Sequence, residues 1–311
     1  MQAAITHPTH WRPLLRCGTA VLALCATLSG PSTAKTQELL VPWYAYPAAP
    51  SAQEDQWAIL AQSASTARFT AIINPADGPG RGGPNADYQR GLQLLSASGA
   101  ALLGYVTTRL PGVALRPIAD VKADVDEWTR SFSAYPVQGI FLDGTSSDAA
   151  DIGYFEELYR YIHTNPRYLR VVLNPGTPPA QAYYQRATAE LIVSFEGNAG
   201  TWSSHVPPSY MSGFGPARFG ALVYGAASVA SMRSAMALAR GRGFGTVYVT
   251  SDDLPNPWDT LPSYWNTEQL AARAAVVPVP GMSALALVLC ALGLCTLGII
   301  GAVRRTRRTR T

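Results

Sequence analysis

Eight short apolar runs, each closed by polar, Gly or Pro residues, alternate with helical patterns along most of the chain. Apolar strands separated by helices predict βα units and a parallel sheet. The predicted strands are Leu39 to Tyr44, Phe69 to Asn74, Ala101 to Thr107, Gly139 to Asp143, Leu169 to Asn174, Leu191 to Glu196, Ala221 to Tyr224 and Thr246 to Thr250. The clearest predicted helices are Ala119 to Phe132, Tyr154 to His163, Ser228 to Arg240 and Trp265 to Ala275.

The number of these units favours one architecture. A continuous apolar strand such as Leu191-Ile192-Val193 fits a sheet covered on both faces, which an open doubly wound sheet and a barrel both provide. Eight units in about 240 residues match the size of a TIM barrel. The sequence therefore predicts a single α/β domain, a (β/α)8 TIM-type barrel, over residues 35–275.

Residues 1–34 are predicted to be a secretory signal peptide. Arg12 and Arg16 precede an apolar run from Cys17 to Leu28, and Ser32-Thr33-Ala34 has the small-residue pattern of a cleavage site. The apolar run is too short to span about 30 Å of hydrocarbon comfortably. We therefore expect the barrel to be exported.

The C-terminal end predicts a membrane anchor. A Pro-rich linker at 276–281 leads into an apolar stretch at 282–303, which is long enough to form a transmembrane helix. The tail at 304–311 is rich in arginine and has no acidic residue, and such tails stay on the cytoplasmic side. We therefore expect anchoring in an inner membrane with the barrel outside the cytoplasm.

The charge and the cysteine content of the chain exclude some classes of function. The whole chain has a net charge of +4, but without its two ends it holds 17 basic and 20 acidic residues and carries −3. A domain that binds nucleic acid would be basic, so no nucleic-acid partner is expected. All four cysteines lie in the two hydrophobic ends, so the exported domain has neither disulfides nor thiol chemistry.

Polar side chains close the predicted strands, and the active site of a TIM barrel lies at the carboxyl ends of its strands. The residues at these ends are Tyr44, Tyr46, Asn74, Thr107, Thr108, Asp143, Asn174, Glu196, Tyr224, Ser251, Asp252 and Asp253. Such a ring of hydroxyl, amide, aromatic and carboxylate groups suits a sugar better than a phosphate or a dinucleotide. The Gly-rich segment 74–84 lacks the spacing of a phosphate-binding loop, so it is predicted to be a shaped loop between a strand and a helix.

Asp143 and Glu196 are the candidate catalytic residues. Each follows an apolar strand; an Asp there could instead cap the next helix, whereas Glu is a poor N-cap. Acids at the tips of the fourth and sixth strands can converge on one cleft. Glycosidic cleavage requires such a pair, because one acid protonates the leaving oxygen while the other attacks the anomeric carbon or activates water.

Other catalytic chemistries lack their residues in this sequence. Outside the signal peptide the histidines are His163 and His205, and neither has a partner at metal-ligand spacing. The sequence contains no GxSxG nucleophile elbow. We therefore expect neither a metal nor a cofactor.

Six motifs occur in the order that is typical of the spherulin 4 family, and the chain resembles that family from residue 38 to about residue 255. The motifs are Val41-Pro42-Trp43-Tyr44-Ala45-Tyr46-Pro47, Ile73-Asn74-Pro75-Ala76-Asp77-Gly78-Pro79-Gly80, Gly104-Tyr105-Val106-Thr107-Thr108, Gly139-Ile140-Phe141-Leu142-Asp143, Leu173-Asn174-Pro175-Gly176-Thr177 and Phe195-Glu196. The resemblance implies a TIM barrel of glycoside hydrolase family 135, whose characterised fungal members cleave galactosamine-containing polysaccharide. It implies endo-acting hydrolysis of an amino-sugar polymer, with Asp143 and Glu196 as the matching acids.

The chain departs from that family at one position. The fungal pattern carries Asp-Glu at the tip of the fourth strand, whereas this chain has Asp143-Gly144. The missing acid leaves a second function open, that of a catalytically inactive barrel that binds carbohydrate.

The C-terminal end also resembles an exosortase-type sorting signal, in which a Pro-rich motif precedes a membrane span and an arginine cluster. The motif is Pro278-Val279-Pro280 and lacks the usual acid. The resemblance implies a sorting protease as a partner and, if the tail is processed, a cell-surface or extracellular protein. Such signals accompany bacterial exopolysaccharide systems, in agreement with a polysaccharide substrate.

Tyr44, Asn74, Tyr105 and Asn174 are predicted to bind the substrate. Trp43, Tyr46 and Trp202 are further candidate aromatic platforms, although each could equally pack in the core.

The two acids are predicted to act in a retaining mechanism. The fourth and sixth strands are next-nearest neighbours, so their backbones lie roughly 9 Å apart. Side chains that lean inward shorten this separation towards the 5 to 5.5 Å or so of retaining enzymes. We expect Asp143 to be the nucleophile or stabiliser and Glu196 the general acid/base.

Overall fold

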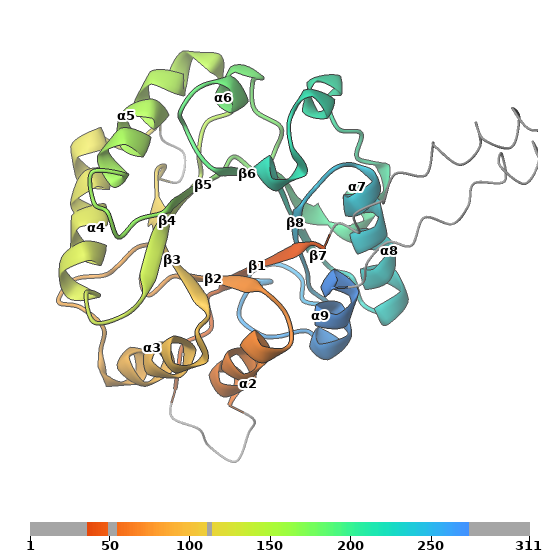
Figure 1. The fold of residues 1–311 in the computed structure, drawn as a ribbon, viewed down its shortest axis with the longest axis horizontal. Coiled ribbons are helices and arrows are strands. Elements are labelled where there is room, and N and C mark those ends of the chain that lie inside the picture. Colours follow the sequence, from red (N-terminus) through yellow and green to blue (C-terminus); the bar gives the residue numbers. More distant parts are fainter. Residues whose placement is uncertain (1–35, 49–54, 111–113, 274–311) are drawn as a thin grey trace, which may run out of the picture. The chain divides into compact units, whose positions relative to one another are not determined.

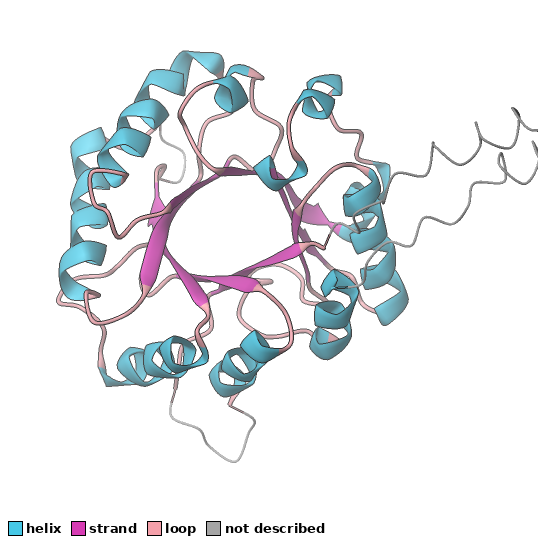
Figure 2. Ribbon diagram, in the orientation of Figure 1, coloured by secondary structure: helices cyan, strands magenta, loops and turns pink. Residues whose placement is uncertain are grey.

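Eight parallel strands close into a barrel in the order in which they follow one another along the chain, and helices surround them (Figure 1). The computed structural model describes residues 36–48, 55–110 and 114–273. They belong to one compact unit, Lys35–Ala274. The alternation of strand and helix around the ring, coloured in Figure 2, confirms the predicted (β/α)8 TIM-type fold.

The barrel consists of the following elements. The strands are β1 (Glu38–Trp43), β2 (Phe69–Ile73), β3 (Ala101–Thr107), β4 (Val137–Asp143), β5 (Arg170–Asn174), β6 (Leu191–Asn198), β7 (Phe219–Tyr224) and β8 (Thr246–Val249). The α-helices are α2 (Gln56–Gln62), α3 (Ala86–Ser98), α4 (Ile118–Ser131), α5 (Ile152–Ile162), α6 (Ala182–Gln185), α7 (Ala199–Ser204), α8 (Val229–Gly241) and α9 (Trp265–Arg273). Short 3-10 helices are η1 (Ser63–Ser65), η2 (Ala149–Asp151), η3 (Ser209–Gly213) and η4 (Pro216–Arg218).

All eight predicted strands are present, and their bounds agree closely with the predicted ones. The four helices predicted from periodicity correspond to α4, α5, α8 and α9. Helices α2 and α3 were not singled out, and local caps define both. The Asp55 side chain accepts hydrogen bonds from the first turn of α2, Asn85 does the same for α3, and Gly99 ends α3 in the left-handed conformation at φ 76°.

The strands owe their apolar character to burial on both faces, towards the barrel interior and towards the helices. Every residue of β2 is buried, and so is every residue of β8. Between β4 and β5 the backbones approach so closely that a Cβ atom on Gly139 would lie 2.1 Å from the carbonyl oxygen of Arg170. This contact requires glycine at the pairing position of β4.

An ion pair joins strands β1 and β5 at the amino-terminal end of the barrel. Arg170 donates from both terminal nitrogens to the two carboxylate oxygens of Glu38, at 2.6 and 3.0 Å, and Thr70 donates to the same carboxylate at 2.7 Å. Burial opposes ionisation of Glu38, but Arg170 and Thr70 outweigh burial and lower its pKa. The pair lies at the opposite end of the strands from the carboxyl face, so it contributes to the stability of the barrel and lies away from the cavity.

The predicted signal peptide (1–34), linker (276–281), transmembrane helix (282–303) and tail (304–311) lie outside the described residues. Among the helices that the structure describes, none has the length and apolar character needed to cross a membrane.

We predict that Arg170→Met lowers the free energy of unfolding at pH 7 by roughly 2 kcal/mol, because Glu38 loses a two-pronged charged partner. The folded-state pKa of Glu38 is lowered, so its contribution is present above its unfolded pKa of about 4.3 and is lost as the pH falls through the folded value. The difference in free energy of unfolding between the wild type and Arg170→Met should therefore become smaller below about pH 4. Thermal unfolding followed by circular dichroism measures this difference.

The matched control is Arg186→Met, which removes the exposed pair with Glu156 and should cost less than about 1 kcal/mol. Equal losses in the two variants, or a difference that does not depend on pH, would contradict a stabilising role for the pair at the end of the barrel.

Candidate active site

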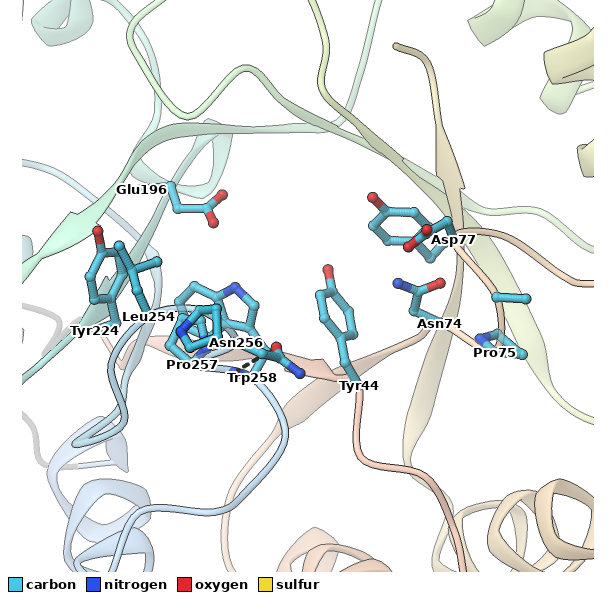
Figure 3. A pocket seen from close by; sticks show the side chains of 13 residues that line it. Tyr44, Asn74, Pro75, Asp77, Glu196, Tyr224, Leu254, Asn256, Pro257 and Trp258 are labelled. Atoms are coloured by element: carbon cyan, nitrogen blue, oxygen red, sulfur yellow. Dashed lines mark hydrogen bonds between the residues drawn. The ribbon is translucent and has the colours of Figure 1, made fainter. Parts of the chain in front are cut away.

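The polar residues that close the strands converge at one end of the barrel, around a cavity of about 490 Å³ (Figure 3). Its lining residues come from the ends of five strands and from the loop after β8. They are Tyr44, Asn74, Pro75, Ala76, Asp77, Tyr105, Glu196, Tyr224, Leu254, Pro255, Asn256, Pro257 and Trp258. Four of the six predicted site residues line the cavity, and the remaining two, Asp143 and Asn174, contact them through hydrogen bonds.

The two candidate acids share one hydrogen-bond donor. The side-chain nitrogen of Asn174 donates to Oδ1 of Asp143 at 2.7 Å and to Oε2 of Glu196 at 2.6 Å. An amide nitrogen carries two hydrogens and no acceptor, so it can serve both carboxylates at once. Asn174 is 7% exposed, and solvent therefore competes little for these bonds.

A tight turn after β5 fixes the orientation of this amide. The side-chain oxygen of Asn174 accepts from the backbone N–H of Gly176 at 3.1 Å, which leaves the nitrogen to face the acids. The carbonyl of Gly176 in turn accepts from the backbone N–H of Glu196 at 2.9 Å. Gly176 has φ 65°, a conformation that glycine adopts without strain. The turn thus holds Asn174 and the backbone of Glu196 together.

Asp143 is held from two further sides. Tyr105 donates from its hydroxyl to Oδ2 of Asp143 at 2.6 Å. Thr108 donates from its hydroxyl and from its backbone N–H to the carbonyl oxygen of Asp143, at 2.7 and 2.8 Å. The Asp143 carboxylate accepts no hydrogen bond from the following helix, so the capping alternative is wrong for this residue in the described part of the chain.

Glu196 follows an irregularity in β6. The pairing of β6 with β7 shifts between Val193 and Phe195, so that Ser194 has no partner of its own. A bulge of this kind re-aims the side chains that follow it and is common beside active sites. The side chain of Glu196 consequently points into the cavity, with the indole of Trp258 below it in the view of Figure 3.

Both acids are harder to ionise than free carboxylic acids. Burial raises the pKa of Asp143, and the hydrogen bonds from Tyr105 and Asn174 oppose that rise. Burial also raises the pKa of Glu196, with the hydrogen bond from Asn174 opposing it and the charge of Asp143 adding to it. Hydrogen bonds from two side chains oppose the rise at each acid, from Tyr105 and Asn174 at Asp143 and from Asn174 and Trp258 at Glu196. The charge of Asp143 acts on Glu196 as a further cause of its raised pKa.

The shared donor also limits the distance between the acids. Since both bonds start at one nitrogen, Oδ1 of Asp143 and Oε2 of Glu196 lie within about 5.3 Å of each other. Retaining glycosidases hold their two carboxyls about 5 to 5.5 Å apart and inverting ones roughly 6.5 to 9.5 Å. The upper limit for this pair of oxygens is compatible with the shorter separation of retaining enzymes.

Tyr44 and Asn74 lie on the wall formed by β1 and β2. The ring of Tyr44 packs edge-on against Tyr105 with centroids 5.6 Å apart, and its hydroxyl points into the cavity (Figure 3). Burial raises the pKa of Tyr44, and the charges of Asp143 and Glu196 raise it further, so the hydroxyl stays protonated and can donate a hydrogen bond. Asn74 accepts from the backbone N–H of Gly78 at 3.1 Å and so also shapes the Gly-rich loop, which lies between β2 and α3 as predicted.

Trp258 and Asp77 line the cavity, although neither was singled out from the sequence as a site residue. Trp258 packs against Tyr224 with centroids 6.2 Å apart, so the two rings form one side of the cavity. Asp77 is the non-glycine residue with positive φ, 51°, among those described, and its carboxylate lies at the cavity. Trp258 and Asp77 belong to loops, so no strand-end pattern marked them, although Asp77 falls within one of the six motifs.

The three further candidate aromatic platforms, Trp43, Tyr46 and Trp202, differ in their exposure to solvent. Trp43 and Trp202 are fully buried, so the interpretation of either as a sugar platform was wrong. Trp202 packs between Phe195 and Phe244, and Trp43 packs against Trp57. Tyr46, by contrast, is 55% exposed.

Gly144, which follows Asp143, has a backbone conformation that disfavours other residues. Its φ is 61°, and a Cβ atom there would lie 3.2 Å from the Cβ atom of Arg109. Arg109 also donates from Nε to the carbonyl of Gly144 at 3.3 Å. An acid at this position would therefore require a different path of the loop beside Asp143.

Within the described residues, no three His, Cys, Asp or Glu side chains are grouped so that they could hold a metal ion. His163, at the C-terminal end of α5, lies with its Nε2 atom 3.2 Å from Oε1 of Glu190. The ring of His205 stacks on Trp202. The two carboxyls at the cavity can transfer protons or act as a nucleophile, and hydroxyl and amide groups surround them.

Comparisons with known proteins agree with this architecture. The sequence model of the spherulation-specific family 4 (Spherulin4) matches residues 38–272. Spherulin-4 of Physarum polycephalum is 32% identical over 247 residues, which cover 76% of this chain and 70% of that protein. The crystal structure of Aspergillus clavatus Sph3 in complex with GalNAc is similar with a TM-score of 0.62 and 23% identity, covering 77% of this chain and 98% of the other. The structural similarity shows a shared barrel fold.

We predict that Asn174→Leu raises the pKa values of both Asp143 and Glu196 further, because each carboxylate loses a donor that stabilises its ionised form. Protonation of the pair should then occur at higher pH when the carboxyl carbons are followed by NMR. The control is Asn165→Leu, whose side chain hydrogen-bonds to Thr129 and to the backbone N–H of Arg167, and this variant should leave the titration of both acids unchanged. A titration that moves to lower pH, or does not move, in Asn174→Leu would refute the bridging role.

Proposed function

This chain belongs to the spherulation-specific family 4, and from that premise we propose that it is a glycoside hydrolase that cleaves a surface or biofilm polysaccharide containing amino sugars. The observation that carries the proposal is the pair of acids that share the Asn174 amide beside a polar and aromatic cavity. Two carboxyls at this spacing are what glycosidic cleavage requires.

The environments of the two acids divide their roles. The pKa of Glu196 is raised by burial and by the charge of Asp143, as suits a general acid, and Glu196 lines the cavity directly. Asp143 is held by Tyr105 and Asn174, which stabilise the carboxylate needed to attack or to stabilise a positive anomeric centre. We therefore propose the roles that the sequence predicted, with Asp143 as nucleophile or stabiliser and Glu196 as general acid/base.

The reaction then proceeds in two steps. Glu196 donates its proton to the glycosidic oxygen as the bond between that oxygen and the anomeric carbon breaks, while a carboxylate oxygen of Asp143 forms a bond to the anomeric carbon. In the second step Glu196 takes a proton from water, the water oxygen bonds to the anomeric carbon, and Asp143 leaves as a carboxylate. The product keeps its anomeric configuration, and no external reactant besides water is needed.

The cavity wall favours sugars that are neutral or positively charged. Its acidic members are Asp77 and Glu196, and none of the described lining residues is Lys or Arg. Tyr44, Asn74 and Tyr105 offer hydroxyl and amide groups to sugar hydroxyls, and Trp258 and Tyr224 offer apolar surface to a sugar ring. The GalNAc bound to the Aspergillus protein supports an amino sugar as the substrate unit.

We further infer that the enzyme works outside the cytoplasm. The predicted signal peptide at 1–34 and the apolar segment at 282–303 support an exported barrel tethered to a membrane. The resemblance to the family supports endo action on long chains. The Pro-rich linker and the arginine tail support a sorting protease as a partner that releases the barrel to the cell surface.

One observation favours a second function. Gly144, with its positive φ and its contact with Arg109, stands where the family resemblance implies an acid next to Asp143. If that acid is required for turnover, the barrel binds carbohydrate without cleaving it. Binding of a glycan by the wild-type protein with no release of reducing ends would favour this alternative.

We predict that Asp143→Asn and Glu196→Gln each lower kcat on a galactosamine-containing polysaccharide by about a thousand-fold, because each removes a carboxyl that takes part in the reaction. Release of reducing ends by the purified protein is the measurement. Asp148→Asn is the control, since this exposed acid caps η2 and lies outside the cavity wall. Full activity in both Asp143→Asn and Glu196→Gln would contradict the assignment of these two acids as catalytic residues.

We also predict that the first-formed product keeps the anomeric configuration of the substrate, because the two carboxyl oxygens lie within about 5.3 Å. Proton NMR of the anomeric signals early in the reaction distinguishes the two outcomes. Inverted product would overturn Asp143 as nucleophile while leaving hydrolysis itself intact.

A further inference from the structure

Tyr46 is an exposed aromatic residue with a fixed position. Its side chain is 55% exposed, yet its hydroxyl donates to Oδ2 of Asp87 at 2.8 Å and accepts from the side-chain nitrogen of Asn85 at 3.0 Å. One edge of the ring packs at 90° against Tyr88, with centroids 5.6 Å apart. Pro47 follows Tyr46 and restricts its backbone to the extended region. Two hydrogen bonds, a ring contact and a proline thus hold a ring that remains open to solvent.

The residues that hold Tyr46 are themselves rigid. Asn85 is the N-cap of α3 and accepts from the backbone N–H of Tyr88 at 3.0 Å. Tyr88 is buried and packs edge-on against Trp57, with centroids 6.1 Å apart. The indole of Trp57 donates to the carbonyl of Ala45 at 3.2 Å, on the same segment as Tyr46. The orientation of Tyr46 is therefore set by the packing of α2 and α3 and not by its own burial.

This ring lies next to the cavity without belonging to its wall. Tyr44, two residues earlier, points into the cavity, and two residues of extended chain span about 7 Å. From the other side, Tyr88 donates to the carbonyl of Asn74, a wall residue, at 3.5 Å. Tyr46 is thus within reach of a chain that leaves the cavity between the ends of β1 and β2.

We propose that Tyr46 forms a distal subsite, on which a further sugar ring of the polysaccharide stacks after the chain has left the cavity. A pyranose ring presents an apolar face of C–H groups, and an aromatic ring held in advance binds such a face with little loss of conformational freedom. The side chains of Asp87 and Asn85 lie beside the ring. The Asp87 carboxylate can accept a hydrogen bond from a sugar hydroxyl, and the Asn85 amide can donate one. The inference rests on the proposed function, because it extends the same sugar-binding site to longer chains.

The test measures binding in the full-length chain with Glu196→Gln, so that turnover does not interfere. The probes are GalNAc, which is small enough for the cavity alone, and a long galactosamine-containing polysaccharide. Adding Tyr46→Ala should raise the Kd for the polysaccharide about 3- to 10-fold, because a ring contact is lost, and should raise the Kd for GalNAc by much less. Tyr46→Phe keeps the ring and loses both hydrogen bonds, so it should give a smaller loss than Tyr46→Ala.

The control is Tyr161→Ala. Tyr161 also donates from its hydroxyl to an aspartate, Asp126, at 2.7 Å, but it lies on the outer helix α5. This variant should bind the polysaccharide like its parent. Equal affinity of Tyr46→Ala and its parent for the polysaccharide, or an equal loss in Tyr161→Ala, would overturn the distal subsite alone. Failure of the parent to bind either probe would instead overturn the proposed function.

Discussion

Two carboxyl groups in a poorly hydrated part of the barrel mouth would repel each other strongly if both were ionised. The amide of Asn174 reduces this cost, since its nitrogen donates to Asp143 and to Glu196 while Gly176 holds its oxygen. One donor thereby limits the spacing of the acids and opposes the rise that burial causes in both of their pKa values. Hydrogen bonds from Tyr105 and Thr108 hold Asp143 further, and Glu196, which lines the cavity, is the acid that we propose exchanges protons with the substrate.

The barrel supplies the rigidity that this arrangement needs. Strands β4, β5 and β6 are neighbours in the closed sheet, so Asp143, Asn174 and Glu196 come from three adjacent strand ends. Strand ends of a packed barrel are held more precisely than loops, which suits a pair whose spacing decides the chemistry. Loops after β2 and β8 complete the cavity with Asp77 and Trp258.

Much of this could be predicted from the sequence, because buried parallel strands are continuous apolar runs and their polar ends mark the active face. Asp143 and Glu196 were found in this way. The shared hydrogen bond could not be, since it depends on the turn at Gly176 and on the bulge at Ser194, neither of which has a periodic signal. The ion pair between Glu38 and Arg170 could not be predicted for a different reason. The two residues are 132 positions apart in the sequence and meet only when the barrel closes.

The central claim is that a glycosidic bond lies between Asp143 and Glu196 when substrate is bound. A crystal structure of Glu196→Gln with a galactosamine-containing oligosaccharide tests it most directly. Our account predicts the scissile oxygen within about 3 Å of the side chain at position 196, with the anomeric carbon facing the Asp143 carboxylate. An oligosaccharide bound away from both side chains, or with its glycosidic bonds out of reach of either, would contradict the account.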